Sequence, residues 1–253
     1  MNELVLYNGL IRIWFLLAVM LFIILFFIAA PYGRFSRMGW GPVIADRIGW
    51  LIMESASVIV FTICFIQRDS PTTTTILILY LLWEIHYVHR AFIYPFSRSS
   101  STSKIPLSVI SAGFLFNVIN SYLNGRYIFS IADGYTNEWL LNPRFTVGIV
   151  LFATGFFINR QADTILSKLR KHGEKGHLIP YGGLYRWISC PNYFGELITW
   201  MGWAVMAWSL AGLTFAVWTA ANLIPRARAN HKWYLNHFPG YPPSRKALFP
   251  WIW

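Results

Sequence analysis

The sequence predicts an all-α, polytopic membrane protein with seven transmembrane helices, folded as a single domain over residues 1–253. Its residues are 56% hydrophobic and only 12% charged, whereas an average soluble domain is about 25% charged. The mean hydropathy is +0.46. So little charge cannot cover a soluble surface at this length. The 20 Phe, 13 Trp and 13 Tyr must be buried in protein or lipid, which excludes a disordered chain.

Seven apolar runs approach the length of about 20 residues that a helix needs to cross a bilayer. In chain order they are Leu10–Ala30, Gly49–Gln67, Ile76–Tyr94, Ile105–Leu123, Phe145–Leu166, Tyr193–Leu210 and Leu213–Leu235. The last run is apolar only as far as Ile224 and then becomes basic, so we expect this helix to leave the bilayer. Little more than Ala211-Gly212 joins the last two runs, which predicts a tight helical hairpin there.

The basic residues predict the orientation of the chain. The formal net charge is +11, which in a soluble protein would suggest nucleic-acid binding. Here the basic residues decorate loops between apolar runs, so we expect no nucleic-acid partner. Sixteen Lys and Arg fall in loops on one side, and only Arg12, Arg68, Arg126 and Arg144 fall on the other. The positive-inside rule then places the N-terminus outside and the C-terminus in the cytoplasm.

Polar residues at membrane depth are costly, so they are the strongest functional signal in this chain. The second run contains one acid, Glu54, about one turn from its cytoplasmic end. At about 100° per residue, the third run places His86, Tyr87, Arg90 and Tyr94 on one face. That face cannot point at lipid, and a purely structural hydrogen bond between helices is the alternative for any single member.

Each of the last three runs also carries a polar stripe near its cytoplasmic end. The stripes contain Asn159, Asp163 and Arg170; Asn192 and Glu196, with Thr199 and Trp203; and Arg226, Asn230 and Trp233, with Tyr234 beside them. Arginine binds phosphate through paired charge-assisted hydrogen bonds, while carboxylates and amides suit ribose hydroxyls and a carboxamide. This inventory fits a dinucleotide, although the chain has neither a GxGxxG turn nor a P-loop.

Other chemistries have weaker support. Glu84, His86 and His89 could ligate a metal, but the chain has only six His and a membrane metal centre would need more of them clustered, so we predict no metal site. There is no GxSxG turn for a serine hydrolase. No pair of broken helices indicates a transporter. Cys64 and Cys190 form no CxxC motif and are expected to be free thiols.

Several blocks of the chain resemble one enzyme family over nearly its whole length. They are Trp50–Glu54 with His86–Arg90, Asn159–Arg170, Ile179–Tyr185, Pro191–Glu196, Trp200 and Tyr241–Pro250. With these residues the chain resembles the steroid 5α-reductases, the 3-oxo-5α-steroid 4-dehydrogenases. We expect a bacterial-type homologue in a bacterial inner membrane, or one in the endoplasmic reticulum if the host is eukaryotic.

The resemblance implies a monomeric, NADPH-dependent membrane reductase in contact with membrane lipids. Residues 1–124 would hold a lipid-like substrate, a 3-oxo-Δ4 steroid, and residues 145–253 would hold the cofactor from the cytoplasm. Glu54 and Tyr87 match the family's catalytic pair and, with Trp50, would contact the substrate. The implied cofactor residues are Tyr32, Arg90, Tyr94, Asn159, Asp163, Arg170, Asn192, Glu196, Arg226, Asn230 and Tyr234.

One residue departs from the family pattern. Eukaryotic steroid enzymes of the family usually carry His where this chain has Asn230. Asparagine can hydrogen-bond a cofactor amide or phosphate, but it has no titratable proton to donate. Any role given to that histidine therefore does not carry over to this chain.

The implied reaction is reduction of a carbon–carbon double bond conjugated to a ketone. Tyr87 would donate a hydrogen bond to the carbonyl oxygen, and Glu54 would support that bond. Three alternatives stay open: a polyprenol or enoyl-thioester reductase, a methyltransferase that uses S-adenosylmethionine, and a non-enzymatic lipid-binding protein. The methyltransferase enters because Pro191–Glu196 is also similar to membrane isoprenylcysteine methyltransferases.

Overall fold

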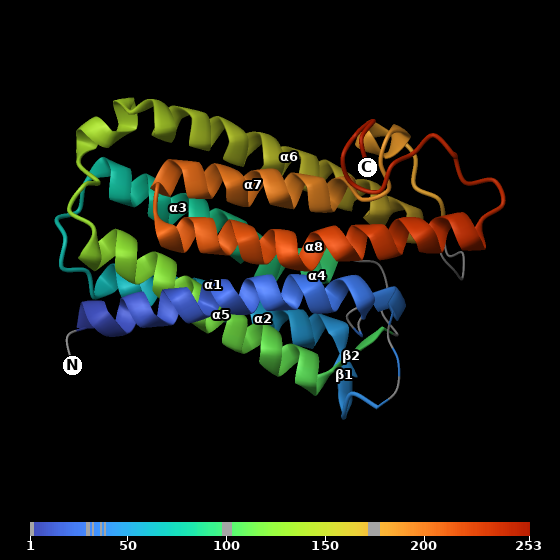
Figure 1. The fold of residues 1–253 in the computed structure, drawn as a ribbon, viewed down its shortest axis with the longest axis horizontal. Helices are drawn as coiled ribbons and strands as arrows, with labels where there is room; N and C mark the ends of the chain where they lie inside the picture. Colours follow the sequence, from blue (N-terminus) through green and yellow to red (C-terminus); the bar gives the residue numbers. More distant parts are fainter. Residues whose placement is uncertain are drawn as a thin grey trace.

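The computed structural model describes residues 3–28, 31, 33–35, 37, 39–97, 103–171 and 178–253, without the side chains of residues 170 and 171. These residues form an elongated bundle of helices (Figure 1), so the predicted all-α class is confirmed. The α-helices of this part are α1 (Glu3–Phe27), α2 (Asp46–Ile66), α3 (Thr74–Val88), α4 (Tyr94–Ser97), α5 (Leu107–Arg126), α6 (Pro143–Lys171), α7 (Pro191–Ala207) and α8 (Leu210–His237).

Shorter helical segments connect these helices. A π-helical segment, His89–Ile93, joins α3 to α4, and a second one, Tyr127–Ile131, continues α5. Three short 3₁₀ segments cover Gly33–Phe35, Asn137–Leu141 and Gly183–Arg186. Local chemistry explains two of the helix starts. The Thr73 side chain accepts the Ile76 N–H at the start of α3, and Pro191 opens α7 at a position where proline is favoured.

Five helical segments of the described chain are long and apolar enough to cross a membrane. They are Glu3–Phe27, Asp46–Ile66, Thr74–Ser97, Leu107–Ile131 and Pro143–Leu169. They match the first five predicted spans. The sixth and seventh predicted spans are α7, which has only 17 residues, and α8, whose C-terminal part is basic. The total of seven spans and the orientation of the termini stay predictions.

The hairpin between α7 and α8 forms as predicted, but its turn lies earlier in the chain. The turn is at Trp208, which has a left-handed φ of 43°, and at Ser209, whose side chain accepts the Gly212 N–H at 3.0 Å. Because Ser209 caps α8 in this way, Ala211 and Gly212 belong to the first turn of that helix. The prediction of a turn at Ala211-Gly212 was wrong.

Helices α6 and α7 run side by side (Figure 1), and glycines let their backbones touch. A Cβ atom built on Gly155 would lie 2.5 Å from the Gly195 carbonyl oxygen, and one built on Gly195 would overlap the backbone of Asn159. Only glycine allows this approach. This close contact fixes the position of α6 along α7, and it places Asn159 of α6 beside Glu196 of α7.

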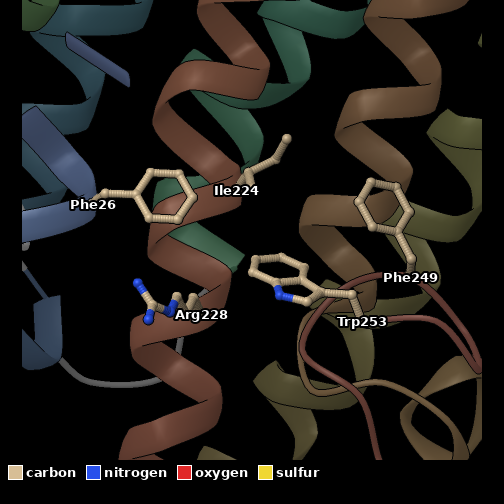
Figure 2. A pocket seen from close by; sticks show the side chains of 5 residues that line it. All are labelled: Phe26, Ile224, Arg228, Phe249 and Trp253. Atoms are coloured by element: carbon tan, nitrogen blue, oxygen red, sulfur yellow. The ribbon is translucent and has the colours of Figure 1, made fainter. Parts of the chain in front are cut away.

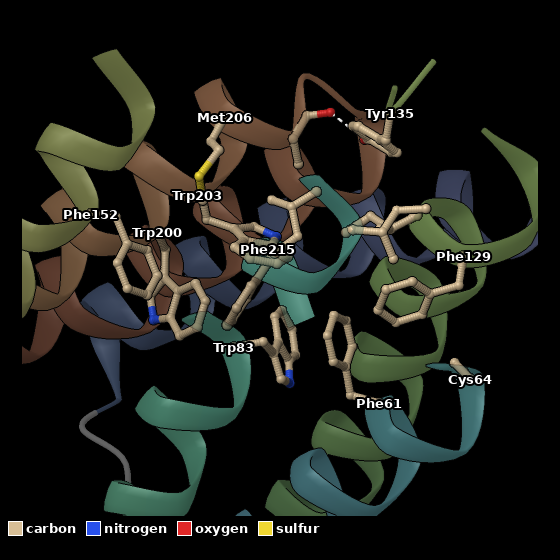
Figure 3. Packing of buried hydrophobic residues seen from close by; sticks show 14 of the residues in the cluster. Phe61, Cys64, Trp83, Phe129, Tyr135, Phe152, Trp200, Trp203, Met206 and Phe215 are labelled. Atoms are coloured by element: carbon tan, nitrogen blue, oxygen red, sulfur yellow. Dashed lines mark hydrogen bonds between the residues drawn. The ribbon is translucent and has the colours of Figure 1, made fainter. Parts of the chain in front are cut away.

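A cluster of aromatic side chains packs α2 and α3 against α7 and α8 (Figure 3). The Phe61 ring of α2 stacks on Trp83 of α3 with centroids 4.4 Å apart. Trp83 contacts Trp203 of α7 at 5.1 Å, and Trp200 contacts Phe215 of α8 at 4.1 Å. Aromatic pairs of this kind add about 0.5–1.5 kcal/mol each beyond the area that they bury. The cluster lies directly beside Tyr87, so it forms the floor of the site described below.

A two-stranded antiparallel sheet, which was not predicted, ties the starts of α2 and α5 together. Strand β1 (Val43–Ala45) pairs with β2 (Lys104–Pro106), with Ile44 opposite Ile105. The Leu107 N–H donates to the Pro42 carbonyl at 2.8 Å and extends this contact. Three-residue strands carry too little alternation to be read from a sequence.

Candidate active site

The two predicted catalytic residues are buried together at the contact of α2 and α3. Glu54 is 7% exposed and Tyr87 is 4% exposed. The Nη2 atom of Arg90 lies 3.3 Å from Oε1 of Glu54, and both groups interact electrostatically with Tyr87. The Arg90 guanidinium lies over the rings of Trp50 and Tyr94, at 5.3 Å and 5.5 Å. The predicted substrate residue Trp50 therefore shares one cluster with the catalytic pair.

A second polar cluster joins α3 to α6 and α7 around Glu196. His86 Nε2 lies 3.2 Å from Glu196 Oε1, which also accepts the Trp200 indole N–H at 2.8 Å. The Asn159 amide donates to Glu196 Oε2 and to the Asn192 carbonyl, both at 2.9 Å. The Asn192 amide in turn donates to Asp163 at 3.4 Å. The structure thus brings together the predicted stripes of α6 and α7.

The stripe on α8 contacts two other parts of the chain. Tyr193 of α7 accepts hydrogen bonds at its hydroxyl from Arg226 Nε at 3.0 Å and Asn230 Nδ2 at 3.3 Å. The Tyr234 hydroxyl accepts a hydrogen bond from Arg34 Nη2 at 3.1 Å, and its ring stacks on Tyr241 at 5.0 Å. The α8 stripe therefore meets α7, the segment after α1 and the C-terminal segment.

Three further predicted residues are two implied cofactor residues, Tyr32 and Arg170, and the stripe residue Trp203. The side chains of Tyr32 and Arg170 lie outside the described residues. Trp203 points into the aromatic cluster (Figure 3), where its indole N–H donates to Asn124 of α5 at 2.9 Å. It lies on the predicted stripe of α7 but belongs to the core.

Sequence reasoning missed several polar residues near these clusters. Arg160, which lies inside the fifth apolar run, contacts His89 at 3.2 Å; its membrane depth was the signal that could have found it. Arg245 is 2% exposed, and its guanidinium lies over the rings of Tyr181 and Tyr241. Arg34 and Tyr193 were also missed. Tyr193 lies within the Pro191–Glu196 block, so a closer reading of that block could have found it.

The three residues considered as metal ligands have separate partners. Glu84 accepts a hydrogen bond from Thr62 at 3.3 Å, His86 contacts Glu196 and His89 contacts Arg160. The described residues contain no group of three or more His, Cys, Asp or Glu side chains that could hold a metal ion. The structure therefore does not bring these three side chains together.

Both cysteines are free and buried. Cys190 immediately precedes α7 and contacts Asn230, and burial raises the pKa of its thiol to about 12. A thiol with a raised pKa carries little thiolate at neutral pH.

An apolar groove of about 520 Å³ lies apart from these clusters (Figure 2). Its lining residues come from α1, α8 and the C-terminal segment: Phe26, Ile224, Arg228, Phe249 and Trp253. The Arg228 guanidinium lies over the Phe26 ring at 5.6 Å. None of the predicted site residues lines this groove, so it is not part of the site built above.

A bundle of apolar helices that buries paired carboxylate, guanidinium, amide and phenol groups is typical of a membrane protein with a functional polar site. Residues 103–253 match the model of the family described as 3-oxo-5-alpha-steroid 4-dehydrogenase. The chain is 40% identical to steroid 5-alpha-reductase DET2 of Arabidopsis thaliana, over 91% of this chain and 90% of that protein. It is 35% identical to 3-oxo-5-alpha-steroid 4-dehydrogenase 1 of Bos taurus, over 93% of each chain. The Homo sapiens protein of the same name is 35% identical to this chain, over 87% of this chain and 85% of that protein.

The chain belongs to the 3-oxo-5-alpha-steroid 4-dehydrogenase family and is an enzyme of that class. The predicted family is confirmed. The non-enzymatic alternative is wrong, and membership of a reductase family favours reduction over methyl transfer.

Proposed function

We propose that this enzyme reduces the C4=C5 double bond of a 3-oxo-Δ4 steroid, or of a similar lipid enone, with NADPH. The observation that carries the proposal is the buried cluster of Glu54, Tyr87 and Arg90 beside the aromatic rings of Trp83 and Trp200. The apolar ring system of a steroid would pack against these aromatic rings. The ketone at one end of the steroid needs a hydrogen-bond donor. The printed names of the family and of its relatives support a steroid as the substrate.

The polar residues fit a phosphate-bearing cofactor. Among the described residues, no hydrogen-bond partner is found for the buried Nη1 of Arg34 or for Nε and Nη1 of Arg245. Buried guanidinium donors of this kind suit phosphate oxygens. We propose that these two arginines join the eleven predicted cofactor residues in holding NADPH. When bound, NADPH supplies the hydride that adds to the β carbon of the enone.

The protein's own residues would stabilise the charge that develops on the substrate. As the β carbon gains hydride, negative charge builds on the ketone oxygen, and the Tyr87 hydroxyl donates a hydrogen bond to that oxygen. Glu54 supports this bond, while its contact with Arg90 holds the carboxyl group in place. Donors aimed at a developing oxyanion lower a barrier by about 3–4 kcal/mol each. A proton from solvent then adds to the α carbon of the enolate and restores the ketone.

Turnover of purified protein tests this proposal. The protein is incubated with NADPH carrying deuterium at the transferred position and with a panel of Δ4-3-ketosteroids, a polyprenol enone and an enoyl thioester. We expect one deuterium at the β carbon of the reduced steroid. A matched titration with S-adenosylmethionine tests for methyl transfer. If no enone on the panel oxidises NADPH, the proposal is wrong.

A further inference from the structure

Three polar side chains form a buried chain of hydrogen bonds between α2 and α5. Ser57 of α2 is 0% exposed, and Asn117 and Ser121 of α5 are 5% and 0% exposed. Ser57 Oγ lies 3.2 Å from Asn117 Oδ1, and Ser121 Oγ lies 2.9 Å from Ser57 Oγ. None of the three was among the predicted site residues. Both helices are candidate membrane spans, where unneeded polar groups are costly.

Asn117 is held in a fixed orientation. Its amide nitrogen donates to the Met53 carbonyl at 2.8 Å, one residue before Glu54. This bond fixes which end of the carboxamide faces Met53, so the oxygen end faces Ser57. The carboxamide therefore offers Ser57 an acceptor and not a donor.

Ser57 lies one helical turn after Glu54 on α2, and its side chain interacts with the buried Tyr87 hydroxyl. A serine hydroxyl has one proton to donate and two lone pairs that accept. The Ser121 hydroxyl donates to one of those lone pairs. The single Ser57 proton then has two possible acceptors, the Asn117 oxygen and the Tyr87 oxygen.

We propose that Ser57 is a positioning residue, which donates its proton to the Tyr87 oxygen when Tyr87 donates its own proton to the substrate ketone. The inference rests on the proposed role of Tyr87. Without substrate, the Ser57 proton rests on the Asn117 oxygen. With substrate, the bonds run in one direction, from Ser121 to Ser57, to Tyr87 and to the ketone. Hydrogen bonds aligned in this way polarise and strengthen one another.

A pure helix-packing role makes a different prediction. If Ser57 only joins α2 to α5, its loss would lower stability and would affect turnover equally whether or not the Tyr87 hydroxyl is present. If it acts through Tyr87, its effect on turnover must depend on that hydroxyl. A double-mutant cycle separates these two cases.

The experiment compares kcat and the NADPH KM of Ser57→Ala, Tyr87→Phe and the double variant. We expect Ser57→Ala to lower kcat about 10-fold with an unchanged NADPH KM, and to have no further effect in the Tyr87→Phe background. Ser121→Ala, one bond further away, should lower kcat about threefold. The matched control is Thr219→Ala, because among the described residues the buried Thr219 hydroxyl donates to the Phe215 carbonyl of its own helix, at 3.0 Å, and to no other group. This control should keep wild-type kcat.

Wild-type kcat in Ser57→Ala, or an equal loss in both backgrounds, overturns the inference. Wild-type kcat in Tyr87→Phe overturns the proposed role of Tyr87 itself and is recognised from that single variant alone. If Ser57→Ala does not fold, Ser57→Cys gives the same test, because a thiol is a weak donor of similar size. It should show an intermediate kcat whose loss again vanishes without the Tyr87 hydroxyl.

Discussion

At the scale of single residues, the polar groups of the site are held by specific partners within an apolar bundle. Glu54 pairs with Arg90 at 3.3 Å. Glu196 contacts His86 and accepts hydrogen bonds from Trp200 and Asn159. Charged groups at membrane depth are rare and usually mark a functional site. Sequence analysis identified Glu54, His86, Arg90, Asn159 and Glu196 for that reason. The pairing explains how the bundle tolerates them.

The first prediction concerns the Tyr87 hydroxyl. Tyr87→Phe removes one oxygen and keeps the ring, so the contact with Trp83 at 5.0 Å survives. We expect kcat to fall by about 10²-fold or more, as for the loss of one oxyanion donor, with the NADPH KM unchanged. The control is Tyr80→Phe on the same helix, whose hydroxyl pairs with Thr62 at 3.1 Å. It should keep normal turnover. Normal turnover by folded Tyr87→Phe protein would remove Tyr87 from the mechanism.

The second prediction concerns Glu54. Glu54→Gln keeps the size and a hydrogen-bond donor but removes the titratable group, so turnover should slow without a large change in NADPH binding. The variant with both Glu54→Gln and Tyr87→Phe should lose less than the product of the two single losses, because both residues act on one oxygen. Single-turnover rates with saturating NADPH measure this. Strictly multiplicative losses would contradict the shared oxygen and leave each residue with an independent role.

The third prediction concerns Arg170, which shares the α6 stripe with Asn159 and Asp163. We assign it to a phosphate of NADPH, so Arg170→Ala should raise the NADPH KM about 10-fold or more, equivalent to about 1.4 kcal/mol. Lys168→Ala is the matched control, because Lys168 is exposed and lies about 200° around the helix from Arg170. An NADPH KM that stays at the wild-type value in Arg170→Ala would make Arg170 an ordinary surface charge.

Sequence reasoning found residues that share a helix face and missed those whose partners lie far along the chain. Helical geometry alone groups His86, Tyr87 and Arg90. It cannot group Arg34 with Tyr234, which are 200 positions apart and meet only in the fold. The hydrogen bonds of Ser57 could not be inferred from sequence for the same reason, since Asn117 and Ser121 come from another helix.

At the scale of elements, apolar length identified the helices, while specific contacts decided where they end. The first helix was predicted from Leu10, but the described part of it already includes Glu3, whose carboxylate pairs with Arg126 at 2.6 Å. The third helix continues beyond Tyr94 to Ser97 through the π-helical segment that carries Arg90. A π-helical segment shifts the side chains that follow it around the helix, and such segments often occur at functional sites.

The fourth prediction tests the close approach of α6 and α7. Gly155→Ala would force a methyl group into the Gly195 carbonyl and the Thr199 backbone. Overpacking of this kind costs about 1–3 kcal/mol, and it would also separate Asn159 from Glu196. We expect a lower melting temperature in detergent and weaker NADPH binding. Gly9→Ala is the control, because α1 leaves open space there. If Gly155→Ala melts and binds NADPH as the wild type does, the helices are not packed as described.

At the scale of the whole molecule, composition was enough to predict an all-α membrane protein, but the arrangement of the helices was not. The aromatic cluster joins Phe61, Trp83, Trp200 and Phe215 from four helices. Nothing in the order of the runs states that these rings meet. In a membrane helix, side chains that face the core and side chains that face lipid are both apolar. The sequence pattern therefore does not distinguish these rings from lipid-facing ones.

The two ends of the bundle differ in charge, and this supports the final prediction, on topology. At the end that carries the N-terminus (Figure 1), Arg126 is neutralised by Glu3 and by Asp69 at 3.0 Å. At the opposite end α8 carries Arg226, Arg228 and Lys232. Because basic residues that flank membrane spans stay on the cytoplasmic side, a reporter fused after Trp253 should be cytoplasmic and one fused before Met1 should be external. The control is a fusion of the same reporter to a protein of known orientation. An external reporter after Trp253 would contradict the orientation and also the proposed access of NADPH from the cytoplasm, because the cofactor stripes lie at that end of α8.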